Sequence, residues 1–193
     1  MSMFDRVLAV TNRHLCTGDF LDQVKRIAAA HPCGLVLREK DLDEDAYQAL
    51  AADVLRICDT HAVPCMLHRF DRVARVLGCA RIHLPLPYLI EHPQAVQGFA
   101  VVGVSVHSVD EAKEAVRLGA TYLTAGHVFL TDCKKGVPAR GLDFLRAVCE
   151  AVPVPVYAIG GITPQNAADC FSVGASGVAV MSGVMNGLSD WNI

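Results

Sequence analysis

The sequence contains no apolar run that approaches the roughly 20 residues that a membrane-spanning helix needs. It has no excess of basic residues either. The formal net charge is −3 and the pI is about 6.2, which gives no electrostatic reason to expect nucleic acid or an anionic membrane as a partner. The first residues, MSMFDRVLAVTN, lack the long apolar core of a secretion signal, so we expect a cytoplasmic protein.

The eight cysteines lack the C-x-x-C spacing of zinc sites and redox centres. Most of them lie among apolar neighbours, so we expect free thiols that pack as small hydrophobic residues rather than disulfides. These cysteines are Cys33, Cys58, Cys65, Cys79, Cys149 and Cys170.

What the 193 residues do contain is one repeated pattern: a short apolar run, a polar or glycine break, and an amphipathic stretch. Most of the runs are apolar throughout, as in strands that are buried on both faces. No linker or low-complexity segment divides the chain, so residues 1–193 are expected to form a single domain. The predicted strands are Arg6–Thr11, Gly34–Arg38, Pro64–His68, Arg81–Leu84, Ala100–Ser105, Thr121–Ala125, one within Pro153–Ile159, and Gly177–Met181.

The stretches between the strands have helical spacing and recognisable end signals. Ser108 opens a predicted helix that stops at Gly119. Thr163 is the predicted N-cap of a later helix, with Pro164 at its first position. Gly119 and Gly174 suit the left-handed position that follows a helix. The residues after the fourth strand, PLPYLIEHPQAVQG, support only a short or irregular helix.

Eight predicted strands that alternate with helices indicate a parallel sheet, and this number favours an α/β fold closed into a (β/α)8 TIM barrel. Periodicity alone leaves a doubly wound open sheet as the alternative. Only SGVMNGLSDWNI follows the last predicted strand, too little for a full final helix. Either a short segment closes the barrel there or a partner subunit covers the gap, which makes a homodimer a hypothesis.

Histidines gather at the carboxyl ends of the predicted strands, where a barrel places its functional side chains. His68, His83, His107 and His127 show neither H-x-H nor H-x-x-x-H spacing, and no set of carboxylates accompanies them, so we expect no metal site. His83 fits a hydrogen-bonded core histidine. His127 follows the strand break at Gly126 and is the candidate acid/base, because imidazole exchanges protons near neutral pH.

Glycine and serine residues after the last two strands predict a phosphate site. Gly160 and Gly161 let the backbone approach an anion, and the helix expected after them would point free N–H groups at it. Ser182 and Gly183 follow the next strand, and these two loops are where barrels often hold phosphate. Taken alone, the glycine pair also fits a simple tight turn.

Charged residues follow two other strands. Three charged residues stand at the end of the second predicted strand: Arg38, Glu39 and Lys40. They indicate either a solvated loop or a site for an anionic substrate. Lys134 and Lys135, after the sixth strand, are open to the same two interpretations.

Four stretches in order, LREKD, VGVSVHSVDEA, AIGGITPQNA and GASGVAVMSG, resemble the thiamine phosphate synthase superfamily across essentially the whole chain. The resemblance implies a (β/α)8 barrel that handles thiazole phosphate. True synthases carry Asn-Asp-Arg after the third strand and Gln-x-Asp after the fourth, which hold magnesium and pyrophosphate. Here His68, Arg69 and Phe70 replace the first set, and Leu86 and Tyr88 replace the glutamine and aspartate, so little is left to hold Mg²⁺.

The stretch GHVFLTDCKKG resembles the thiazole tautomerase branch of this superfamily, where synthases have GPVF instead. In that branch the histidine of GHVF transfers the proton, and the match places this role on His127. The implied reaction aromatises a 2-carboxy-4-methylthiazole phosphate tautomer. Such an isomerisation needs neither metal nor cofactor, but one group must take a proton and one must return it.

The resemblance therefore implies an isomerase of thiamine biosynthesis whose ligand is a small thiazole phosphate. The charge of the chain gives no reason to expect nucleic acid or a membrane as a further partner. Two alternatives stay open. One is a thiamine phosphate synthase that couples thiazole phosphate to hydroxymethylpyrimidine diphosphate, and the other is a non-catalytic binder of such phosphates. The predicted site comprises His127 as the acid/base, Gly160, Gly161, Ser182 and Gly183 for phosphate, and Arg38, Lys40, Ser105, Thr131 and Lys134 for the rest of the substrate.

Overall fold

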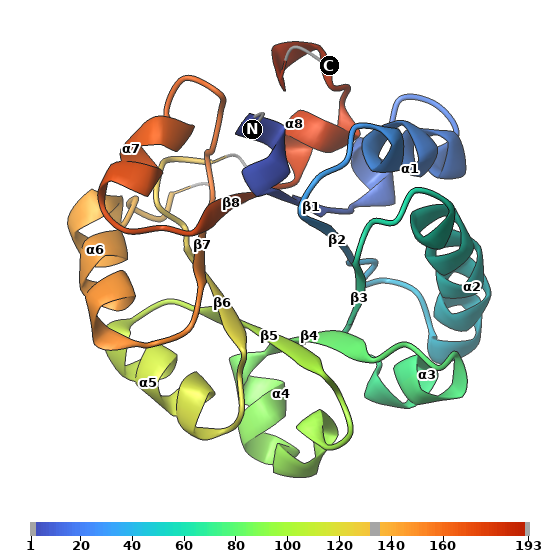
Figure 1. The fold of residues 1–193 in the computed structure, drawn as a ribbon, viewed down its shortest axis with the longest axis horizontal. Coiled ribbons are helices and arrows are strands. Elements are labelled where there is room, and N and C mark those ends of the chain that lie inside the picture. The colour runs from blue at the N-terminus through green and yellow to red at the C-terminus, as the bar shows by residue number, and fades with distance from the viewer. Residues whose placement is uncertain (1–2, 132–135, 192–193) are drawn as a thin grey trace.

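The computed structural model describes residues 3–131 and 136–191 and shows a closed barrel of eight parallel strands (Figure 1). Each strand pairs with the next one in the chain, and β8 pairs with β1 to close the ring, with Ala9 opposite Val180. The predicted barrel is thus confirmed and the open sheet is excluded. The strands are β1 Val7–Val10, β2 Gly34–Leu37, β3 Cys65–His68, β4 Arg81–Pro85, β5 Val101–Val106, β6 Tyr122–Gly126, β7 Val156–Ile159 and β8 Gly177–Val180.

The helices surround the ring of strands (Figure 1), and none in the described ranges is long and apolar enough to cross a membrane. The segment after β4 is short and irregular, as predicted. The α-helices are α1 Phe20–Ala29, α2 Glu44–Thr60, α3 Asp71–Val76, α4 Leu86–Glu91, α5 Val109–Arg117, α6 Gly141–Ala151, α7 Ala167–Ser172 and α8 Ser182–Met185. The 3-10 turns are η1 Met3–Arg6, η2 Arg13–Leu15, η3 Pro93–Val96 and η5 Ser189–Trp191.

Most predicted helix ends are confirmed by their hydrogen bonds and backbone angles. The Ser108 side chain accepts a hydrogen bond from the Glu111 N–H and caps α5. Gly119 and Gly174, which follow α5 and α7, have φ of +102° and +104°, a conformation that costs glycine little.

The predicted start of α7 is wrong. The helix begins at Ala167 rather than after Thr163, because residues 163–166 form a separate turn. The Asn166 side chain holds this turn: its Oδ1 accepts from the Thr163 N–H at 2.9 Å, and its Nδ2 donates to the Gly161 carbonyl at 2.9 Å. The helix N-terminus expected beside the glycine pair is therefore replaced by a turn.

Two hydrophobic layers hold the barrel together. Leu8, Val36, Met66 and Tyr122 belong to a small cluster inside the ring, while a larger cluster packs the strands against the helices. The described cysteines are all free, and those on the helix-facing side include fully buried thiols, as predicted. The buried ones are Cys58, Cys65, Cys79 and Cys170, whereas Cys33 and Cys149 are only partly buried.

The short C-terminal segment packs back onto the start of the chain. Trp191 of η5 meets Phe4 of η1 edge to face, with ring centroids 6.0 Å apart, and both side chains are buried. Figure 1 places α8 and the N-terminal turn next to each other outside the β8–β1 seam. The first of the two predicted ways of closing the barrel, a short segment of the same chain, is thus realised.

Candidate active site

A pocket of about 740 Å³ opens at the carboxyl ends of the strands and collects most of the predicted site. Among the described residues, one predicted site residue does not line the pocket: Gly183 packs beside Trp191 instead. The predicted Lys134 lies outside the described residues. The predicted residues that do line the pocket are Arg38, Lys40, Ser105, His127, Thr131, Gly160, Gly161 and Ser182.

The residues after β2 alternate between the pocket and the protein interior. Arg38 and Lys40 line the pocket, while Glu39 between them is only 2% exposed and accepts hydrogen bonds from Thr11 and Arg13. The Arg38 N–H also donates to the Thr11 hydroxyl at 2.9 Å. The buried carboxylate therefore anchors the segment that carries the two cations.

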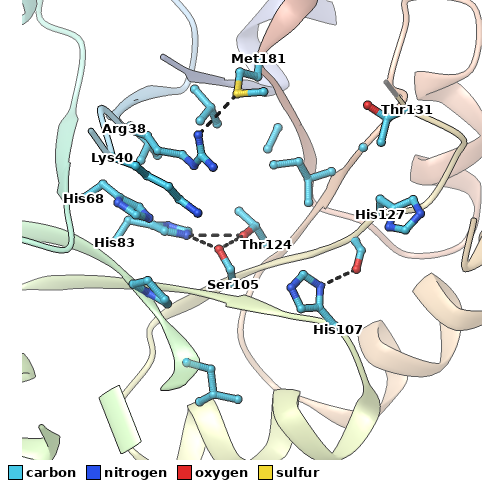
Figure 2. Close-up of a pocket in the computed structure, with 18 of the residues that line it drawn as sticks. Arg38, Lys40, His68, His83, Ser105, His107, Thr124, His127, Thr131 and Met181 are labelled. Atoms are coloured by element: carbon cyan, nitrogen blue, oxygen red, sulfur yellow. Dashed lines mark hydrogen bonds between the residues drawn. The ribbon is translucent and has the colours of Figure 1, made fainter. Parts of the chain in front are cut away.

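Figure 2 shows the two groups of polar side chains in the pocket. Arg38, Lys40, His68 and His83 lie on one side, and His127 and Thr131 lie on the other. A ligand that spans the pocket would thus meet cations at one end and the candidate acid/base at the other.

His127 lies just after β6 and is only 4% exposed. Its Nε2 lies 3.2 Å from the Val137 carbonyl, which only accepts, so Nε2 carries the hydrogen. Its Nδ1 is the one buried side-chain nitrogen or oxygen within the described ranges that has no hydrogen-bond partner. A buried polar atom left unpaired is costly, and functional sites are where such atoms occur.

The glycine pair after β7 has a packing role beside any role in binding. A Cβ on Gly160 would lie 2.3 Å from the Cβ of His127, and one on Gly161 would lie 2.3 Å from the Leu130 carbonyl oxygen. Both glycines have positive φ, +99° and +66°. Neither glycine N–H donates a hydrogen bond to a backbone carbonyl of the described residues. Gly160 therefore leaves room for His127, Gly161 leaves room for the Leu130 carbonyl, and both N–H groups are available as donors to an anion.

A buried polar network forms the floor of the pocket on the cationic side. His83 Nδ1 lies 2.8 Å from the Tyr122 hydroxyl, and His83 Nε2 lies 2.9 Å from Ser105 Oγ. Thr124 Oγ1 lies 3.1 Å from Ser105 Oγ. Burial, with the nearby Arg38 charge, lowers the pKa of His83 to about 3, so this imidazole is neutral. The predicted hydrogen-bonded core histidine is confirmed, although His83 also lines the pocket.

Two further histidines line the pocket. Burial and the neighbouring His83 and Arg38 hold the pKa of His68 well below its usual range. His107 Nδ1 lies 2.7 Å from the Gly126 carbonyl, which only accepts, so Nδ1 carries a hydrogen. The sequence places both histidines at strand ends but does not predict them as site residues, because spacing alone does not tell which side chains face inward.

The residues present do not fit the magnesium site that the superfamily implies. Asp71 follows the residues that replace the first set of magnesium ligands, but its carboxylate already accepts a hydrogen bond from the Tyr88 hydroxyl at 2.7 Å. The carboxylates that line the pocket, Glu91 and Glu111, belong to different helices, and Glu111 accepts the His107 N–H. In the part of the chain that the structure describes, no group of three or more His, Cys, Asp or Glu could hold a metal ion.

Comparisons with known proteins agree on one family. The family model described as "Thiamine monophosphate synthase" matches residues 7–184. "Thiamine-phosphate synthase 2" of Streptococcus pneumoniae serotype 4 is 32% identical over 184 residues, covering 93% of this chain and 87% of that protein. "Putative thiamine-phosphate synthase 2" of Aquifex aeolicus is 32% identical over 182 residues, covering 92% and 96%.

A solved structure gives the same result. The thiamine phosphate pyrophosphorylase from Pyrococcus furiosus superposes with a TM-score of 0.81 at 25% sequence identity, covering 99% of this chain and 92% of that one. FabK from Thermotoga maritima, at 16% identity and a TM-score of 0.69, shares the fold alone.

Proposed function

We propose, from the premise that this chain belongs to the thiamine monophosphate synthase family, that it is a thiazole tautomerase. It would aromatise a carboxythiazole phosphate by moving one proton. The observation that carries the proposal is Nδ1 of His127 in the wall of the pocket, which is buried and has no hydrogen-bond partner among the residues that the structure describes. An imidazole with one nitrogen tied down and the other available is suited to take and return a proton.

The proposed reaction uses His127 twice. In the non-aromatic tautomer the ring carbon that bears the carboxylate is tetrahedral, and Nδ1 takes its proton. The electron pair moves through the ring to the exocyclic carbon, which receives the proton from the imidazolium. Nε2–H stays bonded to the Val137 carbonyl throughout, which fixes the orientation of the ring. Atoms and charge balance without a metal or cofactor.

Two sets of groups would orient the substrate. The N–H groups of Gly160 and Gly161, with Ser182, would hold the phosphate, as the loops after the last strands of such barrels often do. Arg38 and Lys40 would bind the carboxylate at the cationic side of the pocket and stabilise the charge that develops beside it. Gly183 does not line the pocket, whereas Thr131 does, and a role of Thr131 in binding the substrate stays a prediction.

The alternative function is thiamine phosphate synthase, the activity in the names of the relatives. The sequence identity of 32% to these relatives favours it, and the pocket volume of about 740 Å³ leaves room for a second ligand. Against it stands the donor set, since Leu86 and Tyr88 occupy positions where the resemblance leads one to expect magnesium ligands.

A paired assay on one preparation separates the functions. The first reaction contains the non-aromatic carboxythiazole phosphate with EDTA and is followed for formation of the aromatic ring. The second contains thiazole phosphate, hydroxymethylpyrimidine diphosphate and Mg²⁺ and is followed for thiamine phosphate. Turnover in the first alone is the expected result. Turnover in the second alone would replace the proposal by the synthase, and binding without turnover in either would identify a non-catalytic binder.

A further inference from the structure

The contact between His83 and Tyr122 joins two strands that are not neighbours. His83 lies on β4 and Tyr122 on β6, and Gly103 of β5 pairs with both of them in the barrel register. A Cβ on Gly103 would lie 2.3 Å from the Tyr122 hydroxyl oxygen and 2.4 Å from His83 Nδ1. The glycine therefore provides the space in which the two side chains meet.

The direction of the hydrogen bond between Tyr122 and His83 follows from the hydrogen-bond partners available to the Tyr122 hydroxyl. A phenol buried in the barrel must donate its proton, and the described residues offer the Tyr122 hydroxyl no hydrogen-bond partner other than His83. If Tyr122 donates to Nδ1, a neutral His83 carries its hydrogen on Nε2. Nε2–H then donates to Ser105 Oγ at 2.9 Å.

The direction decides what the pocket floor presents to a ligand. Ser105 and Thr124 lie 3.1 Å apart and both line the pocket. With His83 as the donor, one hydroxyl proton satisfies the bond between them and the other is left for the ligand. With the opposite tautomer, His83 would accept a hydroxyl proton, and the pair would present only lone pairs.

We propose that Tyr122 and His83 form a directed hydrogen-bond relay across Gly103 that leaves one hydroxyl proton of the Ser105–Thr124 pair pointing into the pocket. This corner binds a hydrogen-bond acceptor on the ligand, an anionic oxygen rather than an N–H or O–H group. Arg38 lies on the same side of the pocket and favours the same class of ligand (Figure 2). Tyr122 and His83 are positioning residues, which act through Ser105 and Thr124.

A spectroscopic measurement tests the relay directly. In protein labelled with ¹⁵N at histidine, long-range ¹H–¹⁵N correlation spectra report which ring nitrogen of His83 carries the hydrogen, with His83→Gln to assign the signals. The relay requires Nε2–H in the wild type and a loss of that preference in Tyr122→Phe. Finding the hydrogen on Nδ1 in the wild type would overturn it.

Ligand binding provides the second test, with Tyr157→Phe as the matched control. Tyr157 packs against Tyr122 with ring centroids 5.7 Å apart, but its hydroxyl makes no bond to His83. We expect Tyr122→Phe to weaken binding of the aromatic carboxythiazole phosphate about tenfold, while binding of inorganic phosphate is unchanged. Tyr157→Phe should leave both unchanged. Equal affinity of Tyr122→Phe and wild type for the carboxylated ligand would contradict the relay.

A third variant changes no polar atom. Gly103→Ala places a methyl group between His83 and Tyr122 and should reproduce both effects of Tyr122→Phe, while folding is verified by circular dichroism. The use of carboxythiazole phosphate as the probe rests on the proposed function. If the wild type does not bind that ligand, the proposed function fails, and the His83 tautomer alone decides the relay.

Discussion

His83 Nδ1 and the Tyr122 hydroxyl meet at 2.8 Å across the strand that separates them. The imidazole is 3% exposed, lies near the Arg38 charge, and has both ring nitrogens hydrogen-bonded. A neutral histidine is thereby built into the floor of a cationic pocket. Its properties lead to measurable consequences for stability as well as for binding.

The depressed pKa of His83 predicts that acid destabilises the fold. The folded-state pKa of about 3 lies below the ordinary 6.5, so the unfolded chain binds more protons between these two values. The free energy of unfolding should therefore fall as the pH drops below about 6.5, with the His83 contribution about 2 kcal/mol smaller at pH 5 than at pH 7. Urea unfolding at the two pH values measures this difference.

The control for this prediction is a pair of variants. His83→Gln should reduce the pH dependence, while His92→Gln, at an exposed position outside the pocket, should leave it as in the wild type. An identical pH dependence in His83→Gln and wild type would show that His83 does not contribute it.

Gly160→Ala should impair both stability and catalysis, because the new methyl group would collide with His127 and the backbone has positive φ. We expect a loss of about 1–3 kcal/mol in the free energy of unfolding. The tautomerase rate should fall as well. The melting temperature should fall only by the amount that this loss of stability implies. Gly18→Ala is the control, since a Cβ there meets nothing within 4 Å. Unchanged turnover in Gly160→Ala would contradict the seating of His127 by this glycine.

Arg38→Ala should weaken binding of the carboxythiazole phosphate about tenfold or more, because a charge-assisted hydrogen bond is lost. Binding of thiazole phosphate without the carboxylate should change much less, and isothermal titration calorimetry compares the two ligands. Arg56→Ala removes the same charge from an arginine whose side chain is 73% exposed on α2 and serves as the control. Equal losses for both ligands would place Arg38 at the phosphate instead.

Millimolar Mg²⁺ should leave the melting temperature and the tautomerase rate as they are in EDTA at equal ionic strength. The reason is the donor set, in which Glu91 and Glu111 stand on separate helices and Glu111 is hydrogen-bonded to the His107 N–H. Differential scanning fluorimetry and the ring-formation assay provide the two measurements. A rise in melting temperature specific to Mg²⁺ would reveal a metal site that this donor set does not predict.

The fold was predictable because most of the strands are short, apolar runs between clear breaks. Residues 34–37 and 177–180, for example, are buried along their whole length and read directly as strands. The start of α7 was not predictable in this way. Thr163 and Pro164 fit the usual signals of a helix start, but the Asn166 side chain bonds across to Gly161 and delays the helix by a turn.

The candidate site was predictable only where a residue's role depends on its place at a strand end. His127 and Arg38 follow their strands directly, Lys40 comes two residues after Arg38, and the structure brings the three side chains to one pocket. The relay was not predictable, because Tyr122 and His83 are 39 positions apart and meet only through the missing side chain of Gly103. In the sequence, that glycine looks like any other within an apolar strand.

The role of His127 is tested most directly by the rate of ring formation from the non-aromatic carboxythiazole phosphate in the presence of EDTA. Wild type, His127→Asn and His92→Gln are compared at equal enzyme concentration, with binding of inorganic phosphate measured for each. We expect His127→Asn to lose turnover by a factor of about 10² or more while phosphate affinity and the rate of His92→Gln stay near wild type. A His127→Asn enzyme that forms the aromatic ring at nearly the wild-type rate would contradict the account.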